Sequence, residues 1–265
     1  MPSLGGHVWV CRGILFDYCF LESIESLLGV CDEVAVTFFS DNDWAAFQEK
    51  FSGEKRIKSF KLDESRFDEG KGPERLAMWT NFTKDMLSTE WQFCLQADEI
   101  IHEATYPAIR EAMERKDVEA FIVRRFNLWG DPYHYLNYPK LTREGRFGEL
   151  PCSEHTGRLA KIKYKSWNDA ESLDAPFNHD YMEAIRTYHM GFVRDKKKMV
   201  QAKIHMQEKI FNLMKDGEPH HDVRFDEDLK QGGNFRPEAR FSKDDLLPIY
   251  EELPKVIQNW AKERA

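Results

Sequence analysis

The spacing of hydrophobic residues changes back and forth between two periods along the N-terminal part of the chain. Short apolar runs of strand character alternate with segments in which apolar residues recur at helical spacing. The runs that predict strands cover residues 7–12, 33–39, 56–62 and 91–95. The segments that predict helices cover residues 17–29, a stretch that starts near Trp44, and residues 73–87. Strands that alternate with helices predict an α/β fold, with a mostly parallel, twisted sheet between flanking helices.

The pattern becomes less regular in the second half of the chain. A helix over residues 104–116 and a strand over residues 119–125 continue the alternation. Residues 127–180 are instead rich in aromatic residues, Gly and Pro, and contain only short strand candidates. The rest is expected to form an amphipathic helix, a polar loop and a helical stretch interrupted by prolines, over residues 196–216, 217–240 and 243–264.

Composition indicates a globular protein and narrows its class. Of the 265 residues, 42% are hydrophobic, which is enough for a core and too many for a disordered chain. Asp and Glu (46) exceed Lys and Arg (38), so a broad basic surface for nucleic acid is not expected. The 5 cysteines lack C-x-x-C spacing, which favours reduced thiols over disulfides or zinc. Neither a signal-peptide pattern nor an apolar run of about 20 residues occurs, so we expect a cytoplasmic protein without a transmembrane segment.

The first candidate site is the carboxylate pair Asp98–Glu99, which follows the predicted strand 91–95. In open α/β sheets, ligands bind beyond the carboxyl ends of the strands. Carboxylate oxygens suit Mg²⁺ or Mn²⁺, and these ions in turn suit a diphosphate. The alternative is an ordinary solvated turn.

Beside the order of these elements, four segments are informative: 31–36, Thr80-Asn81, Gln96-Ala97-Asp98-Glu99 with 100–103, and 188–194. Together with that order they resemble the nucleotide-sugar half of family-2-type glycosyltransferases with the GT-A fold, which is Rossmann-like. One of the segments, 188–194, looks like a segment of a bacterial and phage branch. The resemblance covers roughly residues 7–205. It implies one GT-A domain over residues 1–265: a nucleotide-sugar half (1–105), an acceptor half (106–195) and a helical C-terminal extension (196–265).

The resemblance further implies a divalent metal, Mn²⁺ or Mg²⁺, held by Asp98 and His189. Relatives usually have Asp where this chain has Gln96, which can hydrogen-bond a ribose hydroxyl but adds no charge. Whether Gln96 abolishes the metal dependence stays open. For His189 the alternative is a histidine buried in the core, and for Gln96 it is a turn-capping role.

Cationic side chains near the predicted site are candidates for the donor diphosphate, because phosphate recognition favours Arg and Lys. Most of the basic run after residue 193 is expected to be a solvated helix face. The candidate donor-binding residues are Arg12, Asp41, Arg75, Gln96, Arg194 and Lys203.

Transfer with inversion needs a base that deprotonates the acceptor hydroxyl. Residues 166–171 resemble the acidic region that serves this role in relatives, so Asp169 and then Glu171 are the candidates. A solvated acidic loop is the alternative. Trp129 and Tyr133 lie in an aromatic-rich stretch and are candidates for stacking on the acceptor.

We therefore expect a glycosyltransferase that uses a nucleoside diphosphate sugar. Its acceptor would be a surface glycan intermediate or a hydroxylated base in phage DNA. Two alternatives remain. A nucleotidyltransferase would share the α/β half but usually has a Gly-rich loop after the first strand, where this chain has Arg12-Gly13. A non-catalytic nucleotide-sugar-binding protein with a degenerate transferase fold would be consistent with Gln96.

Overall fold

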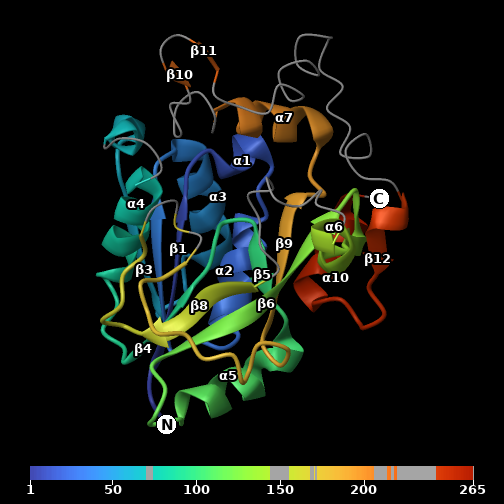
Figure 1. The fold of residues 1–265 in the computed structure, drawn as a ribbon. Helices are drawn as coiled ribbons and strands as arrows, with labels where there is room; N and C mark the ends of the chain where they lie inside the picture. Colours follow the sequence, from blue (N-terminus) through green and yellow to red (C-terminus); the bar gives the residue numbers. More distant parts are fainter. Residues whose placement is uncertain are drawn as a thin grey trace.

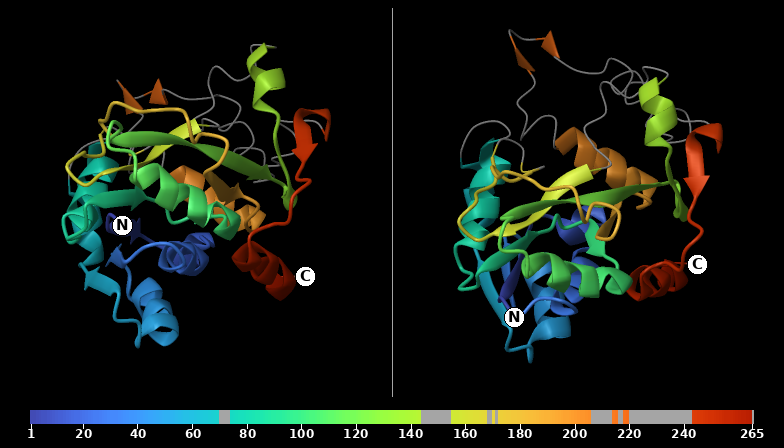
Figure 2. Two further views of the ribbon diagram at one scale, coloured as in Figure 1. Left: turned by 90° about the horizontal axis from the view of Figure 1, so that it is seen from below. Right: turned by 60° about the horizontal axis from the view of Figure 1, so that its bottom comes forward.

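The computed structural model describes residues 1–69, 74–143, 155–167, 170, 172–205, 214–215, 218–219 and 243–264. It is an α/β structure in which helices flank a large curled sheet (Figures 1 and 2). The strands are β1 (Leu4–Val10), β2 (Glu33–Phe38), β3 (Ile57–Lys61), β4 (Trp91–Cys94), β5 (Glu99–Ile101), β6 (Ala120–Trp129), β7 (Asp131–Leu136), β8 (His155–Lys161), β9 (Arg186–Phe192), β10 (Met214–Lys215), β11 (Glu218–Pro219) and β12 (Leu246–Pro248). The α-helices are α1 (Gly13–Phe16), α2 (Phe20–Leu28), α3 (Asp41–Phe51), α4 (Glu74–Lys84), α5 (Tyr106–Met113), α6 (Tyr138–Arg143), α7 (Lys196–His205) and α10 (Lys255–Arg264), and the short 3-10 helices are η1 (Glu64–Asp68), η2 (Glu103–Thr105) and η4 (Lys243–Asp245).

The N-terminal part forms a parallel sheet in the order β4-β1-β2-β3. Side chains of β1 alternate between its two faces. Val8 and Val10 pack with the residues of α2, α3 and α5, whereas Trp9 packs with Trp79 of α4 on the other face. This confirms the expected α/β fold with helices on both faces of a parallel sheet.

The second half continues the same sheet with mixed pairing. β8 joins β4 in antiparallel orientation, and the order then runs β8-β6-β7-β12. β9 pairs in parallel with β6 and antiparallel with β5. Figure 2 shows the long β6 crossing the molecule toward the C-terminal elements β12 and α10. These pairs bring together segments that are far apart in the sequence.

Three sequence-based boundaries are wrong. The helix expected over residues 17–29 begins only at Phe20, because Asp17 ends the separate short helix α1 in a left-handed conformation, at φ 57°. The helix expected over residues 196–216 ends at His205, and Met214–Lys215 is a strand. The helical stretch expected over residues 243–264 contains β12 and becomes an α-helix only at Lys255, because Pro248 and Pro254 interrupt helical hydrogen bonding before it.

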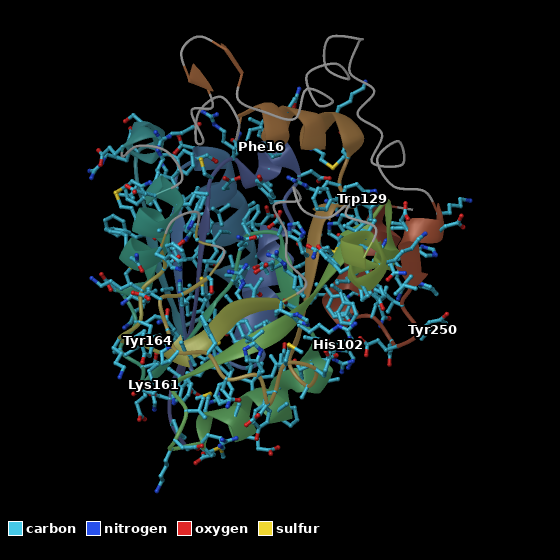
Figure 3. The ribbon with its side chains drawn as sticks, viewed as in Figure 1. Phe16, His102, Trp129, Lys161, Tyr164 and Tyr250 are labelled. Atoms are coloured by element: carbon cyan, nitrogen blue, oxygen red, sulfur yellow. The ribbon has the colours of Figure 1, made fainter. Side chains whose placement is uncertain are left out.

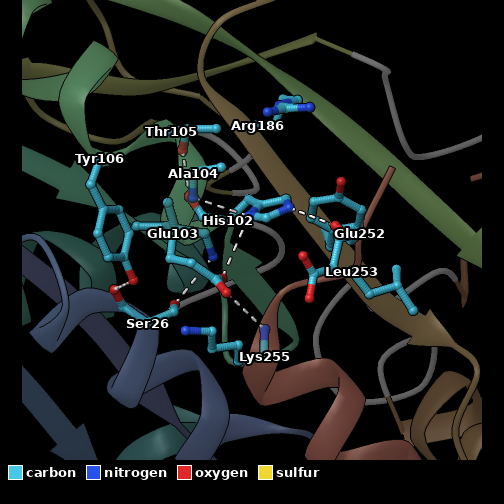
Figure 4. Close-up of polar contacts among 12 residues, drawn as sticks. Ser26, His102, Glu103, Ala104, Thr105, Tyr106, Arg186, Glu252, Leu253 and Lys255 are labelled. Carbon is cyan, nitrogen blue, oxygen red and sulfur yellow. Dashed lines mark hydrogen bonds and ion pairs between the residues drawn. The ribbon is translucent and has the colours of Figure 1, made fainter. Parts of the chain in front are cut away.

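The C-terminal segment is fastened to the connection between β5 and α5 (Figure 4). The His102 Nε2 atom lies 2.7 Å from the carbonyl oxygen of Glu252, and the Lys255 amide donates to Glu103 at 3.1 Å. Trp260 of α10 packs in one apolar cluster with Tyr188 of β9. The end of the described chain therefore supports β9 from one side. Of the helices in the described ranges, none is long and apolar enough to be a membrane span.

Candidate active site between β5 and β9

Asp98 and His189, the two predicted metal ligands, lie side by side. Asp98 stands between β4 and β5, and its carbonyl oxygen accepts a hydrogen bond of 2.7 Å from the Met190 amide. The next residue, Glu99, is paired with His189 across β5 and β9. The Nε2 atom of His189 is 3.4 Å from Oδ2 of Asp98, and the two side chains are only 7% and 13% exposed.

Strand alternation explains why His189 faces this site. Its neighbours Tyr188 and Met190 point into the apolar cluster that α10 covers, so His189 points to the opposite face. Gly191 leaves the room that the imidazole needs. A β-carbon on Gly191 would lie 2.6 Å from the His189 ring and 3.1 Å from Oδ2 of Asp98.

The pair has the chemistry of an incomplete Mn²⁺ site. Carboxylate oxygen together with imidazole nitrogen suits Mn²⁺. Two ligand atoms that bind one ion at about 2.1 Å each and at a right angle are about 3 Å apart, close to the separation here. The Nδ1 atom of His189 is buried and has no hydrogen-bond partner among the described residues. No group of three or more potential ligand side chains occurs in the described ranges. An ion held here would therefore take its further ligands from substrate and water.

Glu99, the second carboxylate of the pair, is directly opposite His189 across β5 and β9, so both side chains are on one face of the sheet, but the Glu99 carboxylate is bound within the protein. It is fully buried and accepts hydrogen bonds from Arg125 of β6 at 3.1 Å and Arg158 of β8 at 2.7 Å. Its other oxygen accepts from the Gln96 amide at 3.1 Å. The sequence analysis missed both arginines, although an Arg within an otherwise apolar strand is itself a signal of a buried ion pair.

Arg194, a predicted donor ligand, is buried next to the site and bonded to main-chain carbonyls. It donates to the carbonyl oxygens of Gly191 and Phe16, each at 3.0 Å, and its guanidinium lies 4.3 Å from the centre of the Tyr18 ring. Burial raises the pKa of Tyr18; Arg194 works against this shift and Asp98 adds to it. Arg194 and Asp98 are thus in one neighbourhood, where Arg194 ties β9 to α1.

The other predicted donor residues follow the carboxyl ends of β1, β2 and β4 or lie in α4 and α7. Arg12 pairs with Glu64 at 2.5 Å, and the exposed Asp41 pairs with Lys61. Arg75 is buried, with its guanidinium 6.0 Å from the ring of Phe67. Gln96 is partly exposed, and its carbonyl oxygen accepts from the Ser23 hydroxyl at 3.1 Å. Lys203 lies in α7, but its side chain is outside the described part of the structure.

Asp43, which the sequence analysis did not single out, shapes the end of β1. It is fully buried, and its two carboxylate oxygens accept from the amides of Gly13 and Ile14, each at 2.8 Å. These amides open the short helix α1, which is flanked by Arg12 and Asp17, both at φ 57°. The signal in the sequence was Ser40, which caps α3 and places Asp43 in its first turn.

On the acceptor side, the two predicted aromatic residues differ in exposure. Trp129 is 2% exposed and packs on Phe192 with ring centres 4.2 Å apart, while Phe192 packs edge-on against His189 at 5.4 Å. Trp129 therefore supports the His189 side of the site. Tyr133 is 56% exposed and available to a ligand. Figure 3 shows Trp129 and Phe16 toward one end of the molecule and Lys161 and Tyr164 toward the other.

The predicted bases Asp169 and Glu171 lie outside the described residues. Ala170 between them is described and buried. Its φ of 63° is unusual for a residue with a side chain. Its carbonyl oxygen accepts a hydrogen bond of 3.3 Å from Arg158. The backbone between the two candidates is thus joined to the cluster that holds Glu99.

Comparison with known proteins gives distant structural similarity only. No family model matches the chain, and no curated protein matches it. A crystal structure of S. aureus TarS (1-349) is 13% identical, with a TM-score of 0.45 over 92% of this chain and 73% of that chain. Another S. aureus TarS structure is 12% identical, with a TM-score of 0.44 over 88% of this chain and 44% of that one. Glucosyl-3-phosphoglycerate synthase from Mycobacterium tuberculosis, in complex with Mn²⁺ and UDP-glucose, is 11% identical, with a TM-score of 0.36 over 63% of this chain and 61% of that one.

Proposed function

We propose that this protein is a GT-A glycosyltransferase that moves a sugar from a nucleoside diphosphate sugar to an acceptor hydroxyl. The observation that carries the proposal is the approach of Asp98 and His189 to 3.4 Å in a largely buried position between β5 and β9. The sequence resemblance independently implies that these two residues are metal ligands. A bound Mn²⁺ or Mg²⁺ would supply positive charge to the departing diphosphate.

Each of the residues around that ion would have its own role. Asp98 and His189 would hold it, with Gly191 leaving the necessary space. Gln96, partly exposed at the same turn, would hydrogen-bond a sugar hydroxyl of the donor. Arg194 would keep β9 and α1 together and so fix the wall of the donor site.

The acceptor would approach from the side of β7. Tyr133 offers an exposed ring on which a glycan, or a base of phage DNA that carries a hydroxyl group, can stack. Asp169 or Glu171 would accept the proton of the acceptor hydroxyl as it attacks the anomeric carbon. The Arg158 bond to Ala170 supports this role, since it joins that stretch of chain to Glu99, the neighbour of Asp98.

The test is hydrolysis of nucleoside diphosphate sugars with and without Mn²⁺, over a panel that includes UDP-glucose. Asp98→Ala should lower the metal-dependent rate by about a thousandfold, which corresponds to about 4 kcal/mol of transition-state stabilisation. Asp180→Ala is the matched control, because it removes an exposed carboxylate that pairs with Arg115 elsewhere on the surface. Full activity and unchanged metal dependence in Asp98→Ala would contradict the proposal.

A further inference from the structure

A buried cluster of three charged residues is built around Glu99, the residue that follows Asp98. Glu99, Arg125 and Arg158 are all fully buried and come from three different strands, β5, β6 and β8. Moving charged groups out of water is expensive, and such a cluster is weak evidence for a gain in stability. Its position next to the site suggests another use.

The Glu99 carboxylate braces the turn that carries Asp98. The Glu99 amide donates to the Gln96 carbonyl oxygen at 3.0 Å, and the Gln96 amide donates back to Oε2 of Glu99 at 3.1 Å. This pair of bonds closes the turn formed by residues 96–99. The second carboxylate oxygen, Oε1, accepts from both arginines. The turn is thereby anchored to β6 and β8 as well as to its own backbone.

Arg158 extends the anchor to a second segment. One of its terminal nitrogens donates to Glu99 at 2.7 Å, and the other donates to the Ala170 carbonyl oxygen at 3.3 Å. Ala170 is held at φ 63°, a conformation that costs free energy unless its surroundings enforce it. A planar guanidinium with donors in a fixed fork fixes the relative positions of the two acceptors it joins.

From these contacts we infer that Glu99, with Arg125 and Arg158, positions Asp98 and couples it to the backbone at Ala170. Glu99 and the two arginines are positioning residues that act through the turn and touch no ligand themselves. The inference deepens the proposed function, and its part concerning metal affinity rests on Asp98 being a ligand. The part concerning the turn stands on the hydrogen bonds alone.

The experiment compares Glu99→Gln with the wild type by two measurements. The first is calorimetric titration with Mn²⁺ alone. The second is hydrogen exchange at the amides of Gln96 and Met190, which bond to Glu99 and to the Asp98 carbonyl. We expect Mn²⁺ affinity to fall at least tenfold and both amides to exchange at least tenfold faster.

Asp245→Asn is the matched control. Asp245 is also a fully buried carboxylate with a cationic partner, Lys140 at 3.0 Å, but it lies beside β12. This variant should lower the melting temperature and leave both readouts at Gln96 and Met190 unchanged. If Glu99→Gln does not fold, the double variant Glu99→Gln/Arg158→Gln, which leaves a smaller charge imbalance, takes its place.

The outcomes separate the two proposals. If Asp98→Ala loses Mn²⁺ while Glu99→Gln binds it like the wild type, the positioning role is overturned and the metal site stands. If the wild type itself binds no Mn²⁺, the proposal that the enzyme uses a metal ion fails. Hydrogen exchange in Glu99→Gln then tests the positioning role by itself. Unchanged protection of Gln96 and Met190 in Glu99→Gln overturns it, and lost protection at these two amides alone supports it.

Discussion

Each half of the sheet contains a buried strand histidine, and the two histidines differ in their hydrogen-bond partners. His7 of β1 is 1% exposed, and its Nε2 atom is 3.0 Å from the side-chain oxygen of Gln92, itself held by main-chain carbonyls. His189 of β9 is 6% exposed, faces Asp98, and keeps a buried Nδ1 without a partner in the described residues. One histidine completes a network within the protein, and the other has bonding capacity left for a ligand.

The carboxylates of the two regions repeat this contrast. Both carboxylate oxygens of Asp43, beside the end of β1, accept hydrogen bonds from the amides at the start of α1. Asp98, beside β5, faces His189, whose Nε2 atom is 3.4 Å from Oδ2 of the carboxylate. Burial alone therefore does not identify a site. A site is identified where buried polar groups of compatible chemistry face each other across a gap that an ion fits.

The largest expected effect in this comparison is the contribution of His7 to the loss of folding stability in acid. Burial lowers its folded-state pKa from 6.5 to about 4. The unfolded chain takes up this proton near pH 6.5 and the folded protein only near pH 4, so stability falls as the pH drops through that window. The His7 contribution to this loss is roughly 3 kcal/mol between pH 7 and pH 4.

Urea unfolding of the wild type and His7→Gln over that pH range measures the difference. The Gln side chain keeps a polar group facing Gln92 but does not titrate, so the variant should have a shallower acid slope. Equal slopes in the two proteins would show that His7 binds its proton equally in the folded and unfolded states, so that burial does not lower its pKa.

A smaller loss is expected when Asp43 is replaced. Asp43→Ala removes the acceptor of two buried amides at the start of α1 and should lower the free energy of unfolding by about 2 kcal/mol. Asp43→Asn retains one carbonyl oxygen and should lose less. Mn²⁺ affinity should stay at the wild-type value in both, and a fall that parallels the loss of stability would contradict the separation of the two regions.

His189→Ala should affect Mn²⁺ binding more than it affects the free energy of unfolding, in contrast to Asp43→Ala. Loss of one of two protein ligands should weaken Mn²⁺ binding about tenfold, equivalent to about 1.4 kcal/mol. His7→Gln is the matched control, because it replaces another buried histidine, on β1, which is not a neighbour of β9 in the sheet, and should leave Mn²⁺ binding unchanged. A variant that melts earlier but binds Mn²⁺ normally would make His189 a core residue.

The smallest effect concerns the surface pair of Arg12 and Glu64, whose side chains are 31% and 46% exposed. Glu64→Ala should change the free energy of unfolding by less than about 0.5 kcal/mol, because exposed ion pairs contribute little. It also frees Arg12. If Arg12 contacts the donor, donor affinity measured by calorimetry should be kept or slightly raised, whereas a large fall would assign the donor contact to Glu64.

The parallel half could be predicted from sequence because its signals are local. The strands β1, β2 and β3 are each followed by helical segments, and Ser40 caps the helix after β2. β9 was harder, because its strand character depends on β5 and β6, which lie far away in the chain. The short apolar and aromatic segment Ile185–Tyr188 precedes His189 in the sequence, but nothing in it indicates the partner strands.

The residue types of the site could be predicted from the sequence, but the directions in which their side chains point could be predicted only in part. Asp98 and His189 do lie together, yet Glu99 could not be assigned to the interior without knowing that Arg125 and Arg158 come from neighbouring strands. Likewise, Trp129 looks available in the sequence, and only the pairing of β6 with β9 places it against Phe192. Side-chain direction in a mixed sheet depends on register, which composition does not encode.

The pairing of β5 with β9 also has a consequence for the order of folding. Asp98 and His189 are about ninety residues apart in the sequence, and contacts of such long range form late and slowly. The β1–β2 and β2–β3 units can close first, since their paired residues lie within about thirty residues of each other, whereas β4 joins β1 across a separation similar to that of Asp98 and His189. During synthesis the parallel half would emerge and begin to pack before β9 exists, and Asp98 and His189 would come together only when the later strands dock. A chain cut before Arg186 would keep Asp98 and still have no site.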